Sequence, residues 1–211
     1  MIPEKFDITG FFGYKNITTM QHDKVFEPLK LLFSQIKPNQ ILELGTASGG
    51  LTLILRDILD ELQFSECLLR TYDINPDRDT IILEENIQNG KNIDCRVKNI
   101  FNQQYSDLDS NYEQEIKDYI NAAGPTIVLC DGGSKKNEFN ILSKFLKSGD
   151  IIMAHDYAPN NDYFETYNKG KVWNWCEIMD EDVSDACKKY NLQPYMSDDF
   201  AKVVWLCTIK K

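Results

Sequence analysis

Three signals of a membrane, secreted or zinc-binding protein are missing from the sequence. No apolar run approaches the roughly 18 residues that a membrane-spanning helix needs, and residues 1–5 form neither the basic nor the apolar segment of a secretion signal. The six cysteines are scattered without a C-x-x-C pair, which excludes an obvious zinc knuckle. We therefore expect a cytoplasmic chain with free thiols and no membrane partner.

Positive charge is also scarce. The chain has 23 Lys and Arg against 33 Asp and Glu, a formal net charge of -10, and such a field repels a phosphate backbone. The basic pairs Lys135-Lys136 and Lys188-Lys189 and the tail Lys210-Lys211 are isolated, and we expect them on solvated faces. The composition therefore argues against nucleic acid as a partner.

Apolar residues are plentiful and regularly ordered. They make up 42% of the 211 residues, which is enough for one folded domain over residues 1–211. Segments with helical spacing of apolar side chains alternate with short apolar runs, which predict strands. Helices are expected at 24–36, 52–64, 78–89, 112–123, 136–146 and 181–190, and strands at 40–44, 68–74, 93–101, 126–130, 150–154, 193–196 and 201–209.

This alternation is typical of βαβ units around a mostly parallel sheet with helices on both faces, a Rossmann-like, doubly wound α/β fold. The last two expected strands, 193–196 and 201–209, are joined only by residues 197–200. Parallel neighbours need a longer crossover. We therefore expect the last pair of strands to be antiparallel.

A glycine-rich turn follows the first expected strand. Its spacing is G-x-x-x-G-G from Gly45, which lacks the G-x-G-x-x-G pattern of dinucleotide-binding folds. Glycine lets the backbone approach a ligand closely, and the preceding acid, Glu43, would accept a hydrogen bond from an amino group but repel a pyrophosphate. The turn therefore favours S-adenosylmethionine over NAD, with a plain connecting turn as the alternative. The expected cofactor-binding residues are Glu43, Gly45, Thr46, Ala47, Ser48 and Gly49.

An acid also ends the second expected strand. Asp73, with Ile74 beside it, can accept hydrogen bonds from both hydroxyls of a ribose; a helix N-cap is its alternative role. At the end of the third expected strand, we expect Asn99 and Ile100 to border the adenine, and we also expect Asp131, after the strand at 126–130, to bind the cofactor. Ligands bind at the carboxyl ends of the strands in such sheets, so these residues and the glycine turn would form one site.

A resemblance to a known family rests on four segments: Met20-Gln21, 41–46 with Gly49-Gly50, 72–74 and Asp131-Gly132. They resemble class I S-adenosylmethionine-dependent methyltransferases, and most closely the cephalosporin hydroxylase and rhamnosyl O-methyltransferase group, followed by macrocin-type O-methyltransferases. The resemblance covers residues 18–160 and implies seven strands with an antiparallel last strand. The chain departs from the family at Ala47, where many members have glycine, and at Gly133-Ser134, where the group often has Asp-His.

The resemblance also implies a metal site at the ends of the next two strands. Asp131 and the pair His155-Asp156 stand where metal-dependent O-methyltransferases hold Mg²⁺. Magnesium takes oxygen ligands, and a bound ion would lower the pKa of an acceptor hydroxyl. We expect all three residues to be catalytic, with His155 as the general base. The alternatives are a hydrogen-bonding role at the strand end for His155 and a turn-forming role for Asp156.

Two segments are expected to border the site. The resemblance implies that the N-terminal segment 1–23, which contains His22, folds over it. We expect residues 157–182 to form an irregular substrate loop, since loops of this length in compact domains usually serve a function. This loop combines acids with aromatic rings, as carbohydrate sites do; alternatively, the rings only pack the loop onto the sheet. The rings belong to Tyr163, Phe164, Tyr167, Trp173 and Trp175.

The resulting hypothesis is an S-adenosylmethionine-dependent methyltransferase that modifies an oxygen of a small acceptor, such as a sugar or glycoconjugate, with assistance from Mg²⁺. Two alternatives stay open: an NAD-dependent oxidoreductase, and a non-catalytic protein that retains the cofactor-binding fold. The sequence does not identify the acceptor, and a homo-oligomer is compatible with it.

Overall fold

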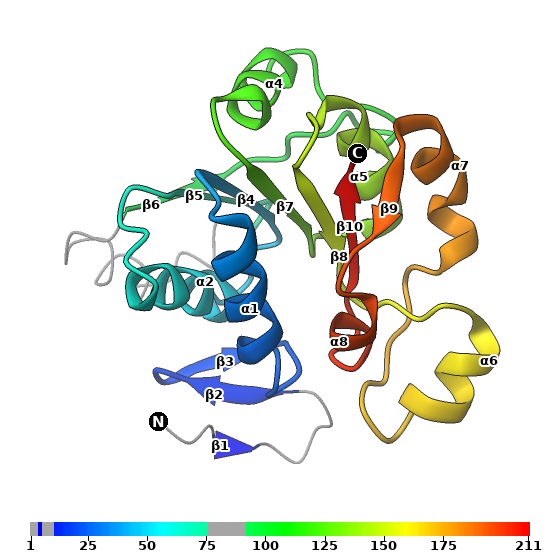
Figure 1. Ribbon diagram of the computed structural model, residues 1–211. Helices are drawn as coiled ribbons and strands as arrows, with labels where there is room; N and C mark the ends of the chain where they lie inside the picture. Colours follow the sequence, from blue (N-terminus) through cyan, green and yellow to red (C-terminus); the bar gives the residue numbers. More distant parts are fainter. Residues whose placement is uncertain (1–3, 6–10, 76–91) are drawn as a thin grey trace.

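A seven-stranded sheet forms the centre of the molecule (Figure 1). The computed structural model describes residues 4–5, 11–75 and 92–211, and the helix expected at 78–89 lies outside them. The strands lie in the order β6-β5-β4-β7-β8-β10-β9. Their bounds are β4 (Gln40–Leu44), β5 (Leu68–Asp73), β6 (Ile93–Val97), β7 (Thr126–Cys130), β8 (Ile151–Ala154), β9 (Leu192–Pro194) and β10 (Leu206–Lys210).

The strand directions confirm the predicted sheet. The pairs from β6 through β5, β4 and β7 to β8 are all parallel. The last strand, β10, lies between β8 and β9 and is antiparallel to both. β9 and β10 are joined by residues 195–205, a connection longer than expected but still below the dozen or more residues that a parallel crossover needs. The fold is thus a Rossmann-like α/β fold with an antiparallel last strand.

Helices cover both faces of the sheet, and each face has its own apolar core. Successive side chains of a strand point to opposite faces, so Ile41 of β4 belongs to the core on one face, whereas Leu42 belongs to the core on the other. Strands β4, β7 and β8 are buried along their whole length, which explains the largely apolar sequences of β7 and β8. The helices are α1 (Phe26–Ile36), α2 (Gly50–Glu61), α4 (Glu113–Asn121), α5 (Lys135–Leu142) and α7 (Asp180–Tyr190), with a 3₁₀ turn, η2 (Ser143–Phe145), after α5.

The C-terminal part departs from the expected elements at two places. A short helix, α8 (Ser197–Ala201), overlaps the start of the strand expected at 201–209, and β10 begins only at Leu206. The apolar residues 203–205 between them are buried in a turn. The sequence suggested a strand here because a short apolar run alone does not distinguish a strand from another buried segment. The segment 157–182, expected to be irregular, contains the helix α6 (Asn161–Tyr163) and the π-helix η3 (Phe164–Asn168).

A small antiparallel sheet near the N-terminus is absent from the predicted elements. It consists of β1 (Glu4–Lys5), β2 (Phe12–Tyr14) and β3 (Ile17–Thr19). Lys15 and Asn16 connect β2 to β3 with positive φ angles of 51° and 66°, as in the tight turns of β-hairpins. Strands of two or three residues leave no periodic pattern to detect in the sequence. Among the helices that the structure describes, none is long and apolar enough to cross a membrane.

The carboxyl ends of the central strands meet at one edge of the sheet. The backbone N–H of Asp131 donates to the carbonyl of Leu44 (3.0 Å), and that of His155 donates to the carbonyl of Cys130 (3.1 Å). Gly45, with φ +90°, lies so close to the end of β7 that a Cβ atom there would be 2.1 Å from the carbonyl oxygen of Asp131. Only glycine fits this position, so the first glycine of the turn brings the ends of β4 and β7 together.

Candidate functional site

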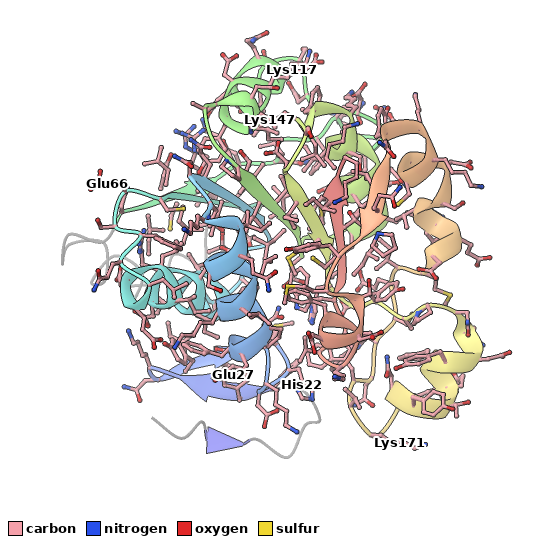
Figure 2. All side chains as sticks on the ribbon, in the orientation of Figure 1. His22, Glu27, Glu66, Lys117, Lys147 and Lys171 are labelled. Atoms are coloured by element: carbon pink, nitrogen blue, oxygen red, sulfur yellow. The ribbon has the colours of Figure 1, made fainter. Side chains whose placement is uncertain are left out.

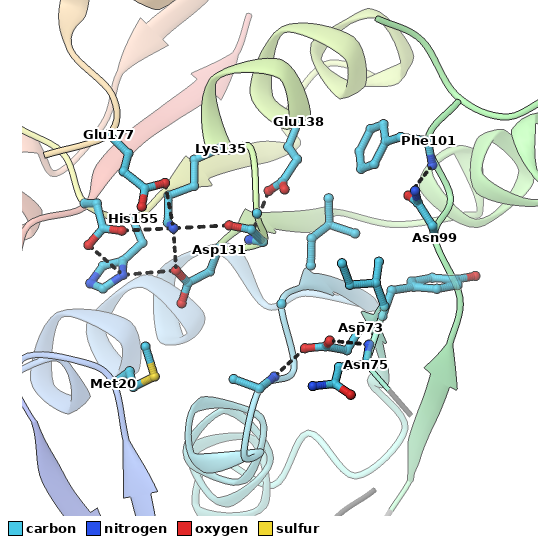
Figure 3. A pocket seen from close by; sticks show the side chains of 18 of the residues that line it. Met20, Asp73, Asn75, Asn99, Phe101, Asp131, Lys135, Glu138, His155 and Glu177 are labelled. Carbon is cyan, nitrogen blue, oxygen red and sulfur yellow. Dashed lines mark hydrogen bonds and ion pairs between the residues drawn. The ribbon is translucent and has the colours of Figure 1, made fainter. Parts of the chain in front are cut away.

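A cavity of about 450 Å³ lies at this edge of the sheet. Figure 3 shows Asp131, Lys135 and His155 on one side of it and Asp73 and Asn99 on the other. The strand ends of β4, β5, β7 and β8, the segment after β6, the N-terminal segment and the loop before α7 all contribute lining residues. The cavity therefore joins the two groups of residues that the sequence suggested, the cofactor group and the acidic group.

Most of the predicted cofactor-binding residues border this cavity. Those that line it are Gly45, Ala47, Asp73, Ile74, Asn99, Ile100 and Asp131, whereas Glu43, Thr46, Ser48 and Gly49 do not. The buried Thr46 hydroxyl hydrogen-bonds that of Thr71 (2.6 Å). Gly49 precedes α2 with φ +87°. These two residues shape the turn behind the surface that faces the cavity.

Asp73 joins the glycine turn to the end of β5. Its Oδ2 accepts a hydrogen bond from the backbone N–H of Ala47 (2.7 Å), and its Oδ1 accepts one from that of Asn75 (2.9 Å). These bonds fix the direction of the carboxylate, which also lines the cavity. A carboxylate has about four acceptor positions, so Asp73 keeps capacity for the hydroxyl groups of a ligand.

The segment after β6, on the same side of the cavity as Asp73, forms a largely apolar wall. Ile100 and Phe101 are buried, and the ring of Phe101 stacks on that of Tyr105 at 5.5 Å between centroids. The side chain of Asn99 turns back to its own segment, where Oδ1 accepts from the N–H of Phe101 (3.0 Å). A flat apolar wall beside an acid at the neighbouring strand end suits a nucleoside, with the base on the wall and the ribose at Asp73.

Glu43 lies beneath the turn rather than in the cavity. It is fully buried, and Thr52 of α2 donates to its Oε2 at 2.6 Å. Side chains alternate along β4, so Glu43 points to the opposite face from Leu42 and Leu44, toward α2. Burial raises the pKa of Glu43 to about 8. The geometry therefore indicates a neutral carboxyl group that supports the turn, whereas the sequence suggested a contact with the cofactor's amino group.

Glu43→Gln is expected to abolish a pH-dependent loss of stability. The pKa of Glu43 is raised in the folded chain to about 8. The stabilisation that its protonated carboxyl provides is therefore complete at pH values below the pKa of the unfolded chain, and it is lost as the pH rises through the pKa of the folded chain. Between these values the free energy of unfolding of the wild type should fall, relative to that of the variant, by up to about 1.4 kcal/mol per pH unit. Urea unfolding across this range measures the difference, and parallel curves for the two proteins would refute it.

The three residues predicted to bind a metal lie together. One ligand atom from each of Asp131, His155 and Asp156 lies within 4.8 Å of the others. The Nδ1 of His155 is 3.0 Å from Oδ1 of Asp131 and 3.5 Å from Oδ1 of Asp156. The metal itself stays a prediction, and other charged side chains lie against the cluster.

His155 is more enclosed than a free general base would be. Its side chain is 2% exposed, and its ring lies between those of Trp173 and Trp205, each at 4.9 Å. Burial lowers the pKa of His155, but the carboxylates of Asp131 and Asp156 outweigh this effect and the net pKa is raised. Asp131, whose side chain is 13% exposed, is the more accessible member of the pair. His155 therefore holds Asp131 in place from behind.

The expectation that the pair Lys135-Lys136 lies on a solvated face is wrong for Lys135. Its side chain is buried, and its ammonium lies 2.9 Å from Oδ2 of Asp156 and 3.2 Å from Oε2 of Glu177. Burial lowers the pKa of Lys135, but nearby carboxylates outweigh this effect and raise it. Lys136, by contrast, is exposed and pairs with Asp182. The acidic cluster thus contains its own cation.

Two further residues at this end of the cavity were not predicted as site residues. Gln21, which is buried, donates from Nε2 to Oδ2 of Asp131 (2.6 Å) and accepts at Oε1 from the indole N–H of Trp205 (2.9 Å). Glu138 accepts from the backbone N–H groups of Gly132 and Ser134. Burial raises the pKa of Glu138 to about 7. The signal for Gln21 was present, since Met20-Gln21 belongs to the segments that carry the family resemblance.

The expected substrate loop reaches the cavity only in part. Trp173 and Trp175 line it, whereas Tyr163, Phe164 and Tyr167 do not. Trp173 is buried and donates from its indole N–H to Oδ1 of Asp156. Trp175 is 42% exposed and stacks on Phe11 at 5.5 Å. Trp173 thus packs the loop onto the sheet, whereas Trp175 presents an exposed aromatic face at the cavity.

His22 does not line the cavity. Figure 2 labels it near the start of α1, where its Nδ1 accepts from the backbone N–H of Lys24 (3.1 Å). This contact agrees with a role in turning the chain into α1. The described part of the N-terminal segment nevertheless reaches the site, because Phe11 and Met20 line the cavity.

Comparison with known proteins supports the fold. No family model matches the chain, and no curated protein matches its sequence. An apo structure of CmcI is 13% identical, with a TM-score of 0.65 over 94% of this chain and 75% of that one. A CmcI structure with Mg and SAM is 16% identical, with a TM-score of 0.61 over 92% and 75%. An O-methyltransferase family protein from Burkholderia thailandensis is 11% identical, with a TM-score of 0.55 over 88% and 55%. The chain has the fold of class I S-adenosylmethionine-dependent methyltransferases.

Proposed function

We propose that this chain transfers a methyl group from S-adenosylmethionine to an oxygen atom of a small acceptor. The observation that carries the proposal is the meeting of three features in one cavity: the glycine turn at Gly45, the carboxylate of Asp73 and the charged cluster around Asp131. They lie at the carboxyl ends of β4, β5 and β7, the edge at which open α/β sheets bind ligands. The similarity to a CmcI structure with Mg and SAM supports the choice of cofactor.

The cofactor would lie across the strand ends. The backbone at Gly45 and Ala47 faces its methionine part, and Asp73 accepts hydrogen bonds from the ribose hydroxyls. Ile100 and Phe101 provide the apolar wall for the adenine. This orientation directs the sulfonium toward Asp131, because Asp131 and Asp73 lie on opposite sides of the cavity (Figure 3).

The chemistry requires little of the protein beyond alignment and removal of one proton. The cofactor supplies an electrophilic methyl group, whose transfer forms a C–O bond and breaks a C–S bond, with the electron pair left on sulfur. Asp131 accepts the proton of the acceptor hydroxyl, while His155 holds its Oδ1 and Gln21 its Oδ2. The ammonium of Lys135, 3.7 Å from Asp131, stabilises the negative charge that develops on the acceptor oxygen.

The acceptor we favour is a sugar or glycoconjugate. The exposed face of Trp175, backed by Phe11, provides a flat apolar surface at the cavity. Glu177, whose side chain is 45% exposed, provides acceptor oxygens for hydroxyl groups beside it. An aromatic face next to a carboxylate is the combination that binds the ring and the hydroxyls of a carbohydrate. The cytoplasmic location and the homo-oligomer stay predictions.

Isothermal titration calorimetry with S-adenosylmethionine, S-adenosylhomocysteine and NAD tests the cofactor directly. We expect micromolar dissociation constants for the first two and no measurable heat for NAD, since the turn lacks the dinucleotide pattern. Micromolar binding of NAD without binding of S-adenosylmethionine would instead support the oxidoreductase alternative and contradict the proposal.

A further inference from the structure

A buried ammonium occupies the place where the family resemblance implies a metal ion. We propose that Lys135 is the resident cation of the Asp131–Asp156–Glu177 cluster, and that the protein binds no divalent metal there. The role of this cation in methyl transfer rests on the proposed function. The exclusion of the metal rests only on the arrangement of the cluster.

The position of the ammonium leaves little space for an ion. Nζ of Lys135 has four oxygen neighbours: Oδ2 of Asp156 at 2.9 Å, the carbonyl of Gly132 and Oε2 of Glu177, each at 3.2 Å, and Oδ1 of Asp131 at 3.7 Å. Magnesium needs a nearly octahedral shell of oxygens at about 2.0–2.1 Å. An ion between Asp131 and Asp156 would therefore have to displace this ammonium. Figure 3 shows Lys135 between Glu177, Asp131 and the residues at the end of β8.

The predicted ligands are also engaged with other partners. Oδ2 of Asp131 accepts from Gln21, and Oδ1 of Asp156 accepts from the indole of Trp173. Nδ1 of His155 is hydrogen-bonded to Oδ1 of Asp131. Nε2 of His155 is buried without a hydrogen-bond partner, but a metal bound through the three atoms named above would break these bonds in addition to moving Lys135. The residues present thus do not fit a magnesium ion, although their types and spacing suggest one.

The location of Lys135 explains how one side chain can serve in this role. It lies at the start of α5, four residues after Asp131, and its buried stem holds the ammonium against the strand ends. The ammonium therefore offsets the negative charge of the three carboxylates, a role that a bound metal ion would otherwise fill. Because it also borders the cavity, it is available to a developing negative charge on a bound acceptor.

The test is a titration of the cofactor-free protein with Mn²⁺, in which electron paramagnetic resonance measures the concentration of the free ion. The wild type is compared with Lys135→Met, which keeps an apolar stem and removes the charge. Lys136→Met is the matched control, since Lys136 is the exposed neighbour outside the cluster. We expect no Mn²⁺ site in the wild type or the control. The Lys135→Met variant should gain a site that holds Mn²⁺ at least about tenfold more tightly than any residual binding by the wild type, because the ammonium no longer neutralises the three carboxylates.

The site gained by Lys135→Met should disappear when Asp131→Asn is added, which locates the bound ion in the cluster. A wild-type Mn²⁺ site that Asp131→Asn abolishes would overturn the proposal, even if Lys135→Met does not fold. A folded Lys135→Met variant that gains no Mn²⁺ site would also contradict it. These readouts involve neither S-adenosylmethionine nor methyl transfer, so they are separate from the calorimetric test of the proposed function.

Discussion

Asp131→Asn is expected to lower kcat by about 10²- to 10⁴-fold, the usual contribution of a positioned general base. The amide keeps the shape of the side chain but cannot take the proton of the acceptor hydroxyl. It can still accept the hydrogen bond that Gln21 donates to Oδ2. The dissociation constant of the cofactor should change far less than kcat, because other residues bind the ribose and the adenine.

Steady-state kinetics and calorimetry on the same protein separate the two effects. Asp162→Asn is the control, since Asp162 is an exposed acid of the loop that does not line the cavity. A kcat within twofold of the wild type for Asp131→Asn would remove Asp131 from the mechanism. A large rise in the cofactor's dissociation constant with unchanged kcat would make Asp131 a binding residue instead.

Asp73→Ala is expected to raise the dissociation constant of S-adenosylhomocysteine by about 10- to 100-fold, the effect of losing charge-assisted hydrogen bonds to the ribose. Asp73→Asn should give a smaller rise, since it keeps one acceptor oxygen. Isothermal titration calorimetry on both variants measures the two dissociation constants and shows which of them rises more.

Asp162→Ala serves as the control for a lost surface carboxylate. The carboxylate of Asp73 also anchors the turn through the N–H of Ala47, so the thermal unfolding of each variant must be compared with that of the wild type. If Asp73→Ala remains folded and binds S-adenosylhomocysteine with unchanged affinity, the ribose lies elsewhere in the cavity.

The sheet and its functional edge were predictable because they depend on local patterns. Strands such as β7 are continuous apolar runs with turn-forming residues at both ends, here Gly124-Pro125 before Thr126. Once the alternation of strands and helices indicates a parallel sheet, the carboxyl ends of the parallel strands must lie at one edge. The meeting of Gly45, Asp73 and Asp131 at one cavity follows from that rule.

The true environment of Lys135 was not predictable in the same way. Adjacent lysines in an acidic chain usually lie on the surface, and nothing local distinguishes Lys135 from Lys136. The difference arises only when β7, β8 and the loop before α7 bring three carboxylates to one point. The contacts of Gln21 have the same origin, because its partners are 110 and 184 residues away in the chain.

The environment of Glu43 follows from the strand to which it belongs. Its position before the glycine turn suggested a contact with the cofactor, but it belongs to β4 itself rather than to the turn. The alternation of side chains along a strand places it opposite Leu44, under α2, where Thr52 is its partner. Its buried neutral state is therefore a consequence of strand register.

The most direct test of the account is the transfer of a labelled methyl group. The protein is incubated with S-adenosylmethionine carrying a tritiated methyl group and a panel of sugars and other hydroxyl compounds, in the presence of EDTA. We predict label in at least one hydroxyl acceptor with the wild type and at least about 10²-fold less with Asp131→Asn. Binding of S-adenosylmethionine without transfer to any acceptor, with or without added Mg²⁺, would contradict the account and indicate a non-catalytic protein that retains the cofactor-binding fold.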